Sequence, residues 1–170
     1  MGVVVGLRFD YGHHAPRGAI LGGMRRLAGE ALVGAPRDEV WQLLDDLESM
    51  PRWLPGVRAV ASSGPTRVGA RYRMRTSLLG IARMRDWEVV EYRPPHRQVR
   101  VALDGSLERR LVLTLDARGS GTRLHAELVF SSALAFPLGL AHEVAAAAWS
   151  AGSSQTLVGA VKRAFEGRPR

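Results

Sequence analysis

The sequence predicts an α+β domain in which a strongly curved antiparallel sheet wraps around a long C-terminal helix. The middle of the chain consists of short segments in which apolar and polar residues alternate, separated by turns rich in glycine and proline. This pattern is typical of an antiparallel meander. The C-terminal stretch instead repeats its apolar residues at helical spacing. At 170 residues, 46% of them hydrophobic, the chain is long enough for one compact core, and we expect no second domain.

Residues 1–24 are expected to form a flexible arm ahead of a single domain at residues 25–167. The arm is rich in glycine and shows no sustained period. Its His13 and His14 are adjacent, so their side chains diverge, and no third ligand is near in sequence. We therefore expect no metal site in the arm. The pattern that runs from Arg25 to Val33 predicts the first strand.

Two short helices are predicted within residues 33–60. Pro36 suits the first helical position, where its missing N–H costs nothing, and the acidic residues that follow complement the helix dipole. Two prolines then break the chain on either side of Trp53 and Leu54. The apolar stripe of the first helix comprises Val40, Leu43, Leu44 and Leu47, with Trp41 on its flank.

Further strands are predicted at residues 71–78, 82–92, 99–103, 107–115 and 124–130. Residues that share one face of a strand alternate along it. The shared faces are Tyr72, Met74, Thr76 and Leu78; Val99, Val101 and Leu103; Leu107, Arg109, Leu111, Leu113 and Leu115; and Leu124, Ala126, Leu128 and Phe130.

The register of the strand at residues 82–92 stays open at this stage. If Trp87 and Val89 point inward, the alternation also turns Arg83, Arg85 and Glu91 inward. A bulge would reverse this alternation. The apolar Val90 and the aromatic Tyr92 favour an inward orientation for the opposite face of the strand.

One long helix is predicted over residues 137–165, and Gly167 and Pro169 end it. Its stripe contains small residues near the centre, which leave volume unfilled against a concave sheet. We therefore expect a cavity between helix and sheet. The stripe comprises Leu140, Val144, Ala147, Ala151, Ser154, Val158, Val161 and Phe165.

Composition excludes several classes of function. The chain has no cysteine, which rules out disulfides, thiolate metal sites and cysteine chemistry. No apolar run approaches the roughly 20 residues that span a bilayer, and we expect a cytoplasmic protein. No Ser-His-Asp order, phosphate loop or metal-ligand spacing is present, so no cofactor is expected. The net charge of +8 is almost entirely arginine and fits a solvated surface or an anionic partner.

The sequence resembles the START-like superfamily, the SRPBCC group of Bet v 1-like, polyketide cyclase/dehydrase and lipid-transport proteins. The resemblance covers about residues 25–167. The motifs that carry it are Ala35-Pro36, Val40-Trp41 and Asp46; Trp53-Leu54-Pro55-Gly56-Val57; Val68-Gly69; Glu88-Val89; Tyr92-Arg93-Pro94-Pro95; Gly121-Thr122-Arg123-Leu124; and Val161-Lys162-Arg163-Ala164-Phe165-Glu166.

The resemblance implies the helix-grip fold, in which about seven strands wrap around the C-terminal helix and enclose an apolar cavity. It also implies that the cavity binds a hydrophobic or amphipathic small molecule, such as a lipid, a quinone or a polyketide, for carriage or sequestration. Fold does not fix function, so the site must be read from the residues. The residues expected to line it are Trp53, Leu54, Tyr72, Met74, Thr76, Trp87, Val89, Arg109, Leu111, Phe130, His142 and Trp149.

An enzyme is the first alternative. Cyclases of the group typically use an inward arginine, with tyrosine, histidine or aspartate, to steer aldol condensation and dehydration of a polyketide chain. Here Arg109 would hold the developing oxyanion, and His142 or Tyr72 would move protons. Aligned on Trp87, the arginine that these cyclases carry late in that strand falls near Glu91.

A nucleic-acid or membrane partner is the second alternative. Arg71, Arg73 and Arg75 share the outer face of one strand, and Arg100 and Arg110 are candidates to extend it. Such a patch would suit a ribosome surface or an anionic membrane. Aromatic residues for base stacking are missing from that face, so no specific nucleic acid is expected.

Overall fold

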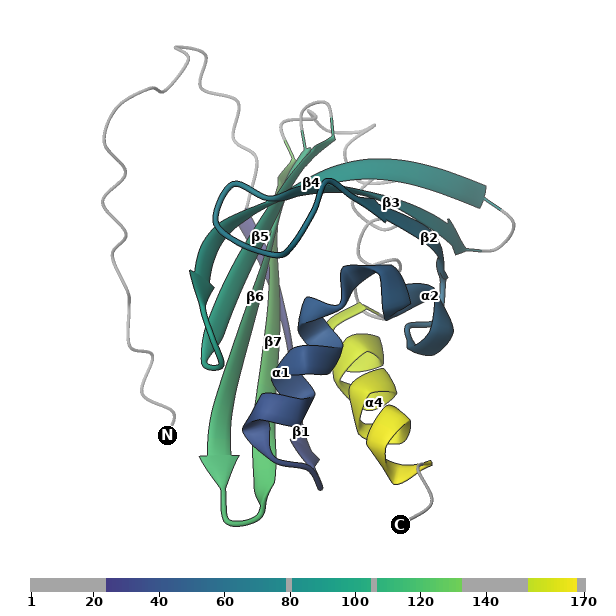
Figure 1. Cartoon of the computed structure of the whole chain (residues 1–170). Coiled ribbons are helices and arrows are strands. Elements are labelled where there is room, and N and C mark those ends of the chain that lie inside the picture. The colour runs from purple at the N-terminus through teal and green to yellow at the C-terminus, as the bar shows by residue number, and fades with distance from the viewer. Residues whose placement is uncertain (1–23, 79–80, 105–106, 133–152, 168–170) are drawn as a thin grey trace.

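The computed structural model describes residues 24–78, 81–104, 107–132 and 153–167. In these residues seven strands form one antiparallel sheet, and the helices lie on its concave side (Figure 1). The elements in chain order are β1 (Met24–Val33), α1 (Arg37–Asp45), the 3₁₀ helix η1 (Leu47–Ser49), α2 (Met50–Trp53), β2 (Val57–Ser62), β3 (Arg71–Leu78), β4 (Ile81–Arg93), β5 (Arg97–Asp104), β6 (Leu107–Arg118), β7 (Gly121–Ser132) and α4 (Ser153–Glu166).

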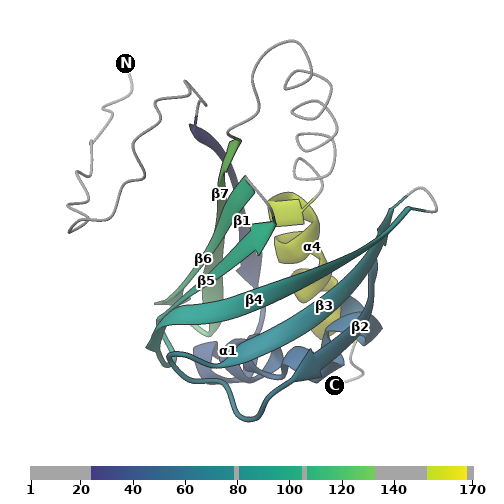
Figure 2. The ribbon, with the colours of Figure 1, turned by 90° about the horizontal axis from the view of Figure 1, so that it is seen from above.

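The strands follow the order β1-β7-β6-β5-β4-β3-β2 across the sheet. All neighbours except β1 and β7 are consecutive in the chain, so tight hairpins or short connections join them. Seen from above, the sheet bends around the helices (Figure 2). The predicted helix-grip α+β fold is confirmed.

Helix α1 begins one residue later than the sequence analysis places it, because Pro36 stands at the N-cap with φ −56°. The last turn of α1 contains no basic residue, so the carbonyls at its C-terminus depend on other elements for positive partners. The carboxylate of Asp46 then accepts a hydrogen bond from the Ser49 amide at 3.2 Å and starts η1.

Two large groups of buried side chains, and a small one around Leu128, make up the core of the described residues. The first joins α1, β6, β7, α4 and the end of β1, with Val40, Leu115 and Val161 fully buried at its centre. The second lies under η1 and α2 against β2–β5, and includes Tyr72 and Trp87. Most of the predicted inward faces agree with this, because alternate residues of β3, β6 and β7 are buried.

Helix α4 packs against β1 and β7. Ser154, Val158 and Val161 are buried as the helical stripe predicts. The approach to β1 is close at Gly29, where an added Cβ would lie 2.9 Å from the backbone of Ser154. Residues 137–152 of the predicted helix lie outside the described residues, and so does the arm at residues 1–23.

A bulge in β4 settles the open register. The pairing of β4 with β5 shifts between Val89 and Glu91, so the alternation reverses there. Trp87 and Val89 are buried before the bulge, and Tyr92 packs into the core after it. Of the two alternatives, the bulge is the one observed, so Glu91 does not point inward with Val89: its carboxylate pairs with Arg97 on the outer face.

Candidate functional site

Two adjacent rows of side chains cross the concave face from β3 to β6. The strand register brings Tyr72, Trp87, Ala102 and Arg109 into one row. The neighbouring row contains Val89, Arg100 and Leu111. Side chains in such rows are cross-strand neighbours on one face of the sheet. Aromatic, aliphatic and cationic groups therefore meet in one place.

Tyr72 and Trp87 form the aromatic part of this face. Their rings are stacked, with centroids 6.3 Å apart and planes inclined by 7°. The indole N–H of Trp87 is buried and has no hydrogen-bond partner among the described residues, although a buried Trp N–H usually finds one. The described part of the concave face thus contains a buried indole donor without an acceptor.

Arg100 occupies the centre of the concave face and is fully buried, with 0% of its surface exposed. Its Nε donates to Oε1 of Gln98 at 2.6 Å, and its Nη2 donates to the Leu44 carbonyl at 2.7 Å. The guanidinium carbon lies 5.6 Å from the centre of the Tyr72 ring. Its Nη1 and the Nε2 of Gln98 are buried, and the part of the chain that the structure describes supplies neither with a hydrogen-bond partner.

This placement corrects the expectation that Arg100 extends an outer arginine patch. Val99 and Val101 share a face of β5, but that face is the outer one, because Gln98, Arg100 and Ala102 pair with inward-facing residues of β4 and β6. Val99 is nevertheless buried. A central strand covered on both faces does not reveal its inner face by hydrophobicity. Sequence reasoning therefore missed Arg100 and Gln98.

The bond from Arg100 to Leu44 also serves the end of α1. A cation at a helix C-terminus complements the helix dipole and satisfies a carbonyl, and α1 supplies none of its own. The same end is held by the Tyr92 hydroxyl, which donates to Oδ2 of Asp45 at 3.1 Å. Thr66 adds a hydrogen bond to the Asp45 carbonyl. Three separate segments thus hold the end of α1.

Burial changes the acidity of both tyrosines near this face. It raises the pKa of the Tyr72 phenol above its ordinary value, and the positive charge of Arg100 opposes this only in part. Burial likewise raises the pKa of Tyr92, and the Asp45 carboxylate raises it further. Both phenols are consequently neutral hydrogen-bond donors around pH 7.

Arg109 lies on the concave face as predicted, with 6% of its surface exposed. Arg85 is 8% exposed and lies on the same face of β4 as Trp87. Arg83, which the alternation also turned inward, is exposed. With Arg100, the concave face of β4–β6 thus carries three buried guanidinium groups.

The profile of the family described as "Polyketide cyclase / dehydrase and lipid transport" matches residues 24–166. The chain belongs to this family. The match spans both rows of the concave face and the helices α1, α2 and α4. No curated protein sequence matches the chain significantly.

Solved structures of low sequence identity share the fold of this family member. The Zhui aromatase/cyclase from Streptomyces sp. R1128 has a TM-score of 0.72 at 17% identity, over 87% of this chain and 97% of that one. A Thermus thermophilus protein has a TM-score of 0.70 at 18% identity, over 85% of this chain and 100% of that one. A START superfamily protein from Mycobacterium smegmatis has a TM-score of 0.65 at 14% identity, over 85% of this chain and 98% of that one.

The remaining predicted site residues fall into three groups. Thr76 and Val89 are buried on the concave face, and Met74 and Leu111 are half-buried there. Trp53 and Leu54 are half-buried against both parts of the core, and the Trp53 indole donates to Oγ of Ser49 at 3.0 Å. His142, Trp149 and the side chain of Phe130 lie outside the described residues.

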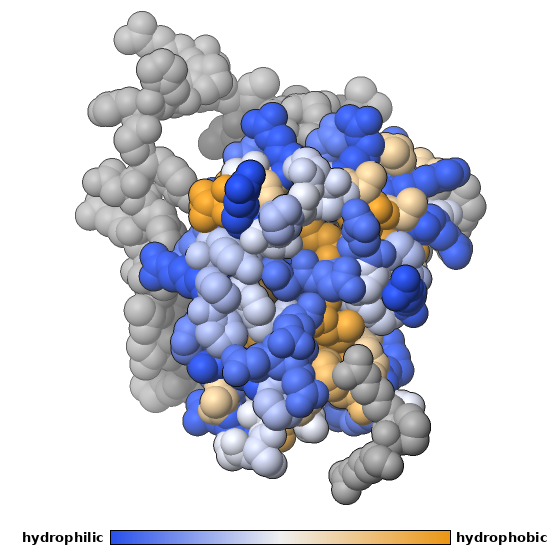
Figure 3. Space-filling view, in the orientation of Figure 1, coloured by the Kyte–Doolittle hydropathy of each residue, from blue (hydrophilic) through white to orange (hydrophobic). Residues whose placement is uncertain are grey.

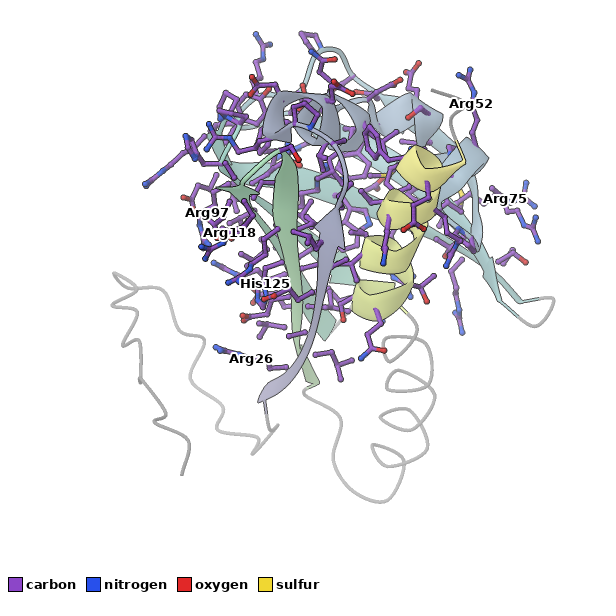
Figure 4. All side chains as sticks on the ribbon, turned by 90° about the horizontal axis from the view of Figure 1, so that it is seen from below. Arg26, Arg52, Arg75, Arg97, Arg118 and His125 are labelled. Carbon is purple, nitrogen blue, oxygen red and sulfur yellow. The ribbon has the colours of Figure 1, made fainter. Side chains whose placement is uncertain are left out.

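The outer face carries paired arginines. Arg71 pairs with Glu88 at 2.9 Å, and Arg73 forms two hydrogen bonds with Asp86. Arg75 is exposed on the same strand, and its side chain extends away from the sheet (Figure 4). With Arg100 buried and these carboxylates interspersed, the convex face is a mixed-charge surface.

A surface hollow of about 630 Å³ lies where α1, α2 and α4 meet. Trp53, Leu43 and Ala164 contribute its apolar lining, while Glu39, Asp46 and Arg52 add charges of both signs. Apolar surface is visible at this junction (Figure 3). The hollow is separate from the two rows of the concave face, because it contains none of their residues.

The described part of the chain offers neither a metal centre nor a membrane span. Among the residues that the structure describes, no three His, Cys, Asp or Glu side chains are grouped so as to hold a metal ion. None of the helices in the same ranges is long and apolar enough to cross a membrane.

Proposed function

We propose that the protein binds a hydrophobic or amphipathic small molecule against the concave face of β3–β6, for carriage or sequestration. The observation that carries this proposal is a set of buried donors without partners among aromatic and aliphatic side chains. They are Trp87 Nε1, Gln98 Nε2 and Arg100 Nη1, with the Thr76 hydroxyl on the same face of β3. Buried polar groups in folded proteins are nearly always hydrogen-bonded, so a set of unpaired ones indicates a binding face.

The two rows also indicate which part of the ligand goes where. Tyr72, Val89 and Leu111 would supply ring and aliphatic contacts to an apolar body. The unpaired N–H groups are suited to oxygen acceptors on the same molecule. A mostly apolar wall with a few convergent polar groups is the usual make-up of a small-molecule site.

Native mass spectrometry of the protein purified from its own host tests this function. We expect a lipid-like or polyphenol-like mass to leave with the folded protein and to be released on denaturation. The Trp87→Ala variant should retain less of it, because the variant loses both stacking surface and a donor. Protein that is always empty would contradict carriage.

Cyclisation or dehydration of a polyketide-like substrate is a second candidate. The burial of Arg109 in the same row as Tyr72 favours it, and so does the fold shared with an aromatase/cyclase. Arg109 would stabilise an enolate oxygen in a water-poor site. Tyr72, whose pKa is raised by burial, would act as a proton donor rather than a base. His142 stays a predicted partner.

A further inference from the structure

We infer that the ligand is an anion whose carboxylate docks against Arg100, flanked by Gln98 and Trp87. The inference rests on the proposed function and adds the charge of the ligand to it. Three observations carry it: the absence of a described carboxylate in contact with Arg100, the kind of groups left unpaired, and the way Arg100 is held.

Among the residues that the structure describes, those in contact with the Arg100 guanidinium are neutral. A guanidinium stays protonated in proteins, and this one is fully buried. Its contacts are the Gln98 amide oxygen, the Leu44 carbonyl and the face of the Tyr72 ring. Of the described side chains on the concave face of β3–β7, none is a carboxylate. Because a buried charge is costly unless it is paired, an anionic ligand would supply the missing partner.

The unpaired groups on Arg100, Gln98 and Trp87 are all N–H donors. Gln98 Oε1 is taken by Arg100 Nε, so the remaining amide group of Gln98 is a donor. Trp87 pairs with Ala102, two residues along β5 from Arg100, and its indole is a donor only. A carboxylate accepts hydrogen bonds and donates none. Its bonds to a guanidinium are stronger than those of a neutral oxygen.

Arg100 is fixed before any ligand arrives. Gln98 holds Nε and the end of α1 holds Nη2, which leaves Nη1 as the free corner of a rigid guanidinium. A donor held in this way loses little freedom when an acceptor binds. We therefore expect the protein to discriminate between ligands that share one alkyl chain and differ in whether the head group is charged.

Isothermal titration with dodecanoate and dodecan-1-ol tests the inference, since the two differ mainly in head-group charge. Dodecanoate should bind the wild type at least tenfold more tightly than the alcohol. Arg100→Gln should abolish that preference and leave the alcohol unaffected, whereas Arg110→Gln, on the outer face of β6, should preserve it. Equal affinities in the wild type would overturn the inference and leave the proposed function intact. Binding of neither compound would count against the proposed function itself.

A second variant covers the case in which Arg100→Gln does not fold. Gln98→Glu keeps the shape of Gln98 and places a carboxylate on Arg100 Nε, so the guanidinium is neutralised from within the protein. The preference for dodecanoate should then fall at least tenfold while thermal melting stays cooperative. A folded Gln98→Glu protein that keeps the full preference would overturn the inference.

Discussion

Arg100 joins three parts of the molecule through one guanidinium: Gln98 on its own strand, Leu44 at the end of α1, and the ring of Tyr72 on β3. One side chain thus helps to place the short helices and also presents a cation to the concave face. Loss of Arg100 would therefore affect both stability and binding. Gln98→Glu is the variant that separates the two effects, because it keeps the arginine.

The outcome at Arg109 and Arg100 shows what strand alternation can predict about single residues. Arg109 could be placed inward because it alternates with the leucines of β6, and the structure confirms it. Arg100 could not, because it alternates with Val99 and Val101, which lie on an outer face that is itself partly covered. The amide of Gln98 gave no signal either, since its role depends on a contact with Arg100 that only the fold creates.

The enzyme candidate makes a prediction at the level of Arg109. Arg109→Ala should lower turnover of a linear poly-β-ketone thioester about 100-fold or more, the usual effect of removing an oxyanion donor. The matched variant Arg110→Ala, on the opposite face of β6, should keep its rate. Product analysis by chromatography measures both, with circular dichroism to confirm folding. An Arg109→Ala protein with wild-type turnover would eliminate that role.

Among the secondary-structure elements, β1 and α4 approach each other closely at Gly29. Gly29→Ala would place a methyl group 2.9 Å from the backbone of Ser154. Neither backbone can yield locally, so α4 must shift. We expect a loss of about 1–3 kcal/mol in unfolding free energy, as for overpacking elsewhere.

Gly34→Ala is the control, because an added Cβ there meets nothing within 4 Å and the substitution should change stability little. Urea denaturation of both variants checks the prediction. Equal stability of the two proteins would mean that α4 does not lie against Gly29 as described.

The sequence predicted strand boundaries where turn residues mark them. It did not predict the irregularity that depends on how strands pair. Strand β3 and the start of β6 match their predicted positions because a glycine lies close to each of these boundaries, whereas β7 extends past both of its predicted ends. The bulge after Val89 has no such marker: it lies inside a continuous run of strand-forming residues. Only pairing with β5 reveals it, and it decides that Glu91 faces outward.

For the whole molecule, the order of the sequence patterns predicted the fold but not the proposed binding face. Alternating strands followed by one long helix leave few ways to cover every apolar face, which is why the helix-grip arrangement was predictable. The binding face depends on which side chains three or four strands bring into register. Its central cation came from a residue that looked like part of the outer surface.

Ligand should bind at the concave face rather than in the hollow between α1, α2 and α4. Indole N–H signals in a ¹H–¹⁵N spectrum separate the two, since Trp87 lies on the concave face with an unpaired N–H, whereas Trp53 lines the hollow. Trp87→Phe and Trp53→Phe variants assign the signals. During titration with dodecanoate, the Trp87 signal should move downfield while that of Trp53, already bonded to Ser49, stays in place. Movement of Trp53 with an unchanged Trp87 would contradict binding at the concave face.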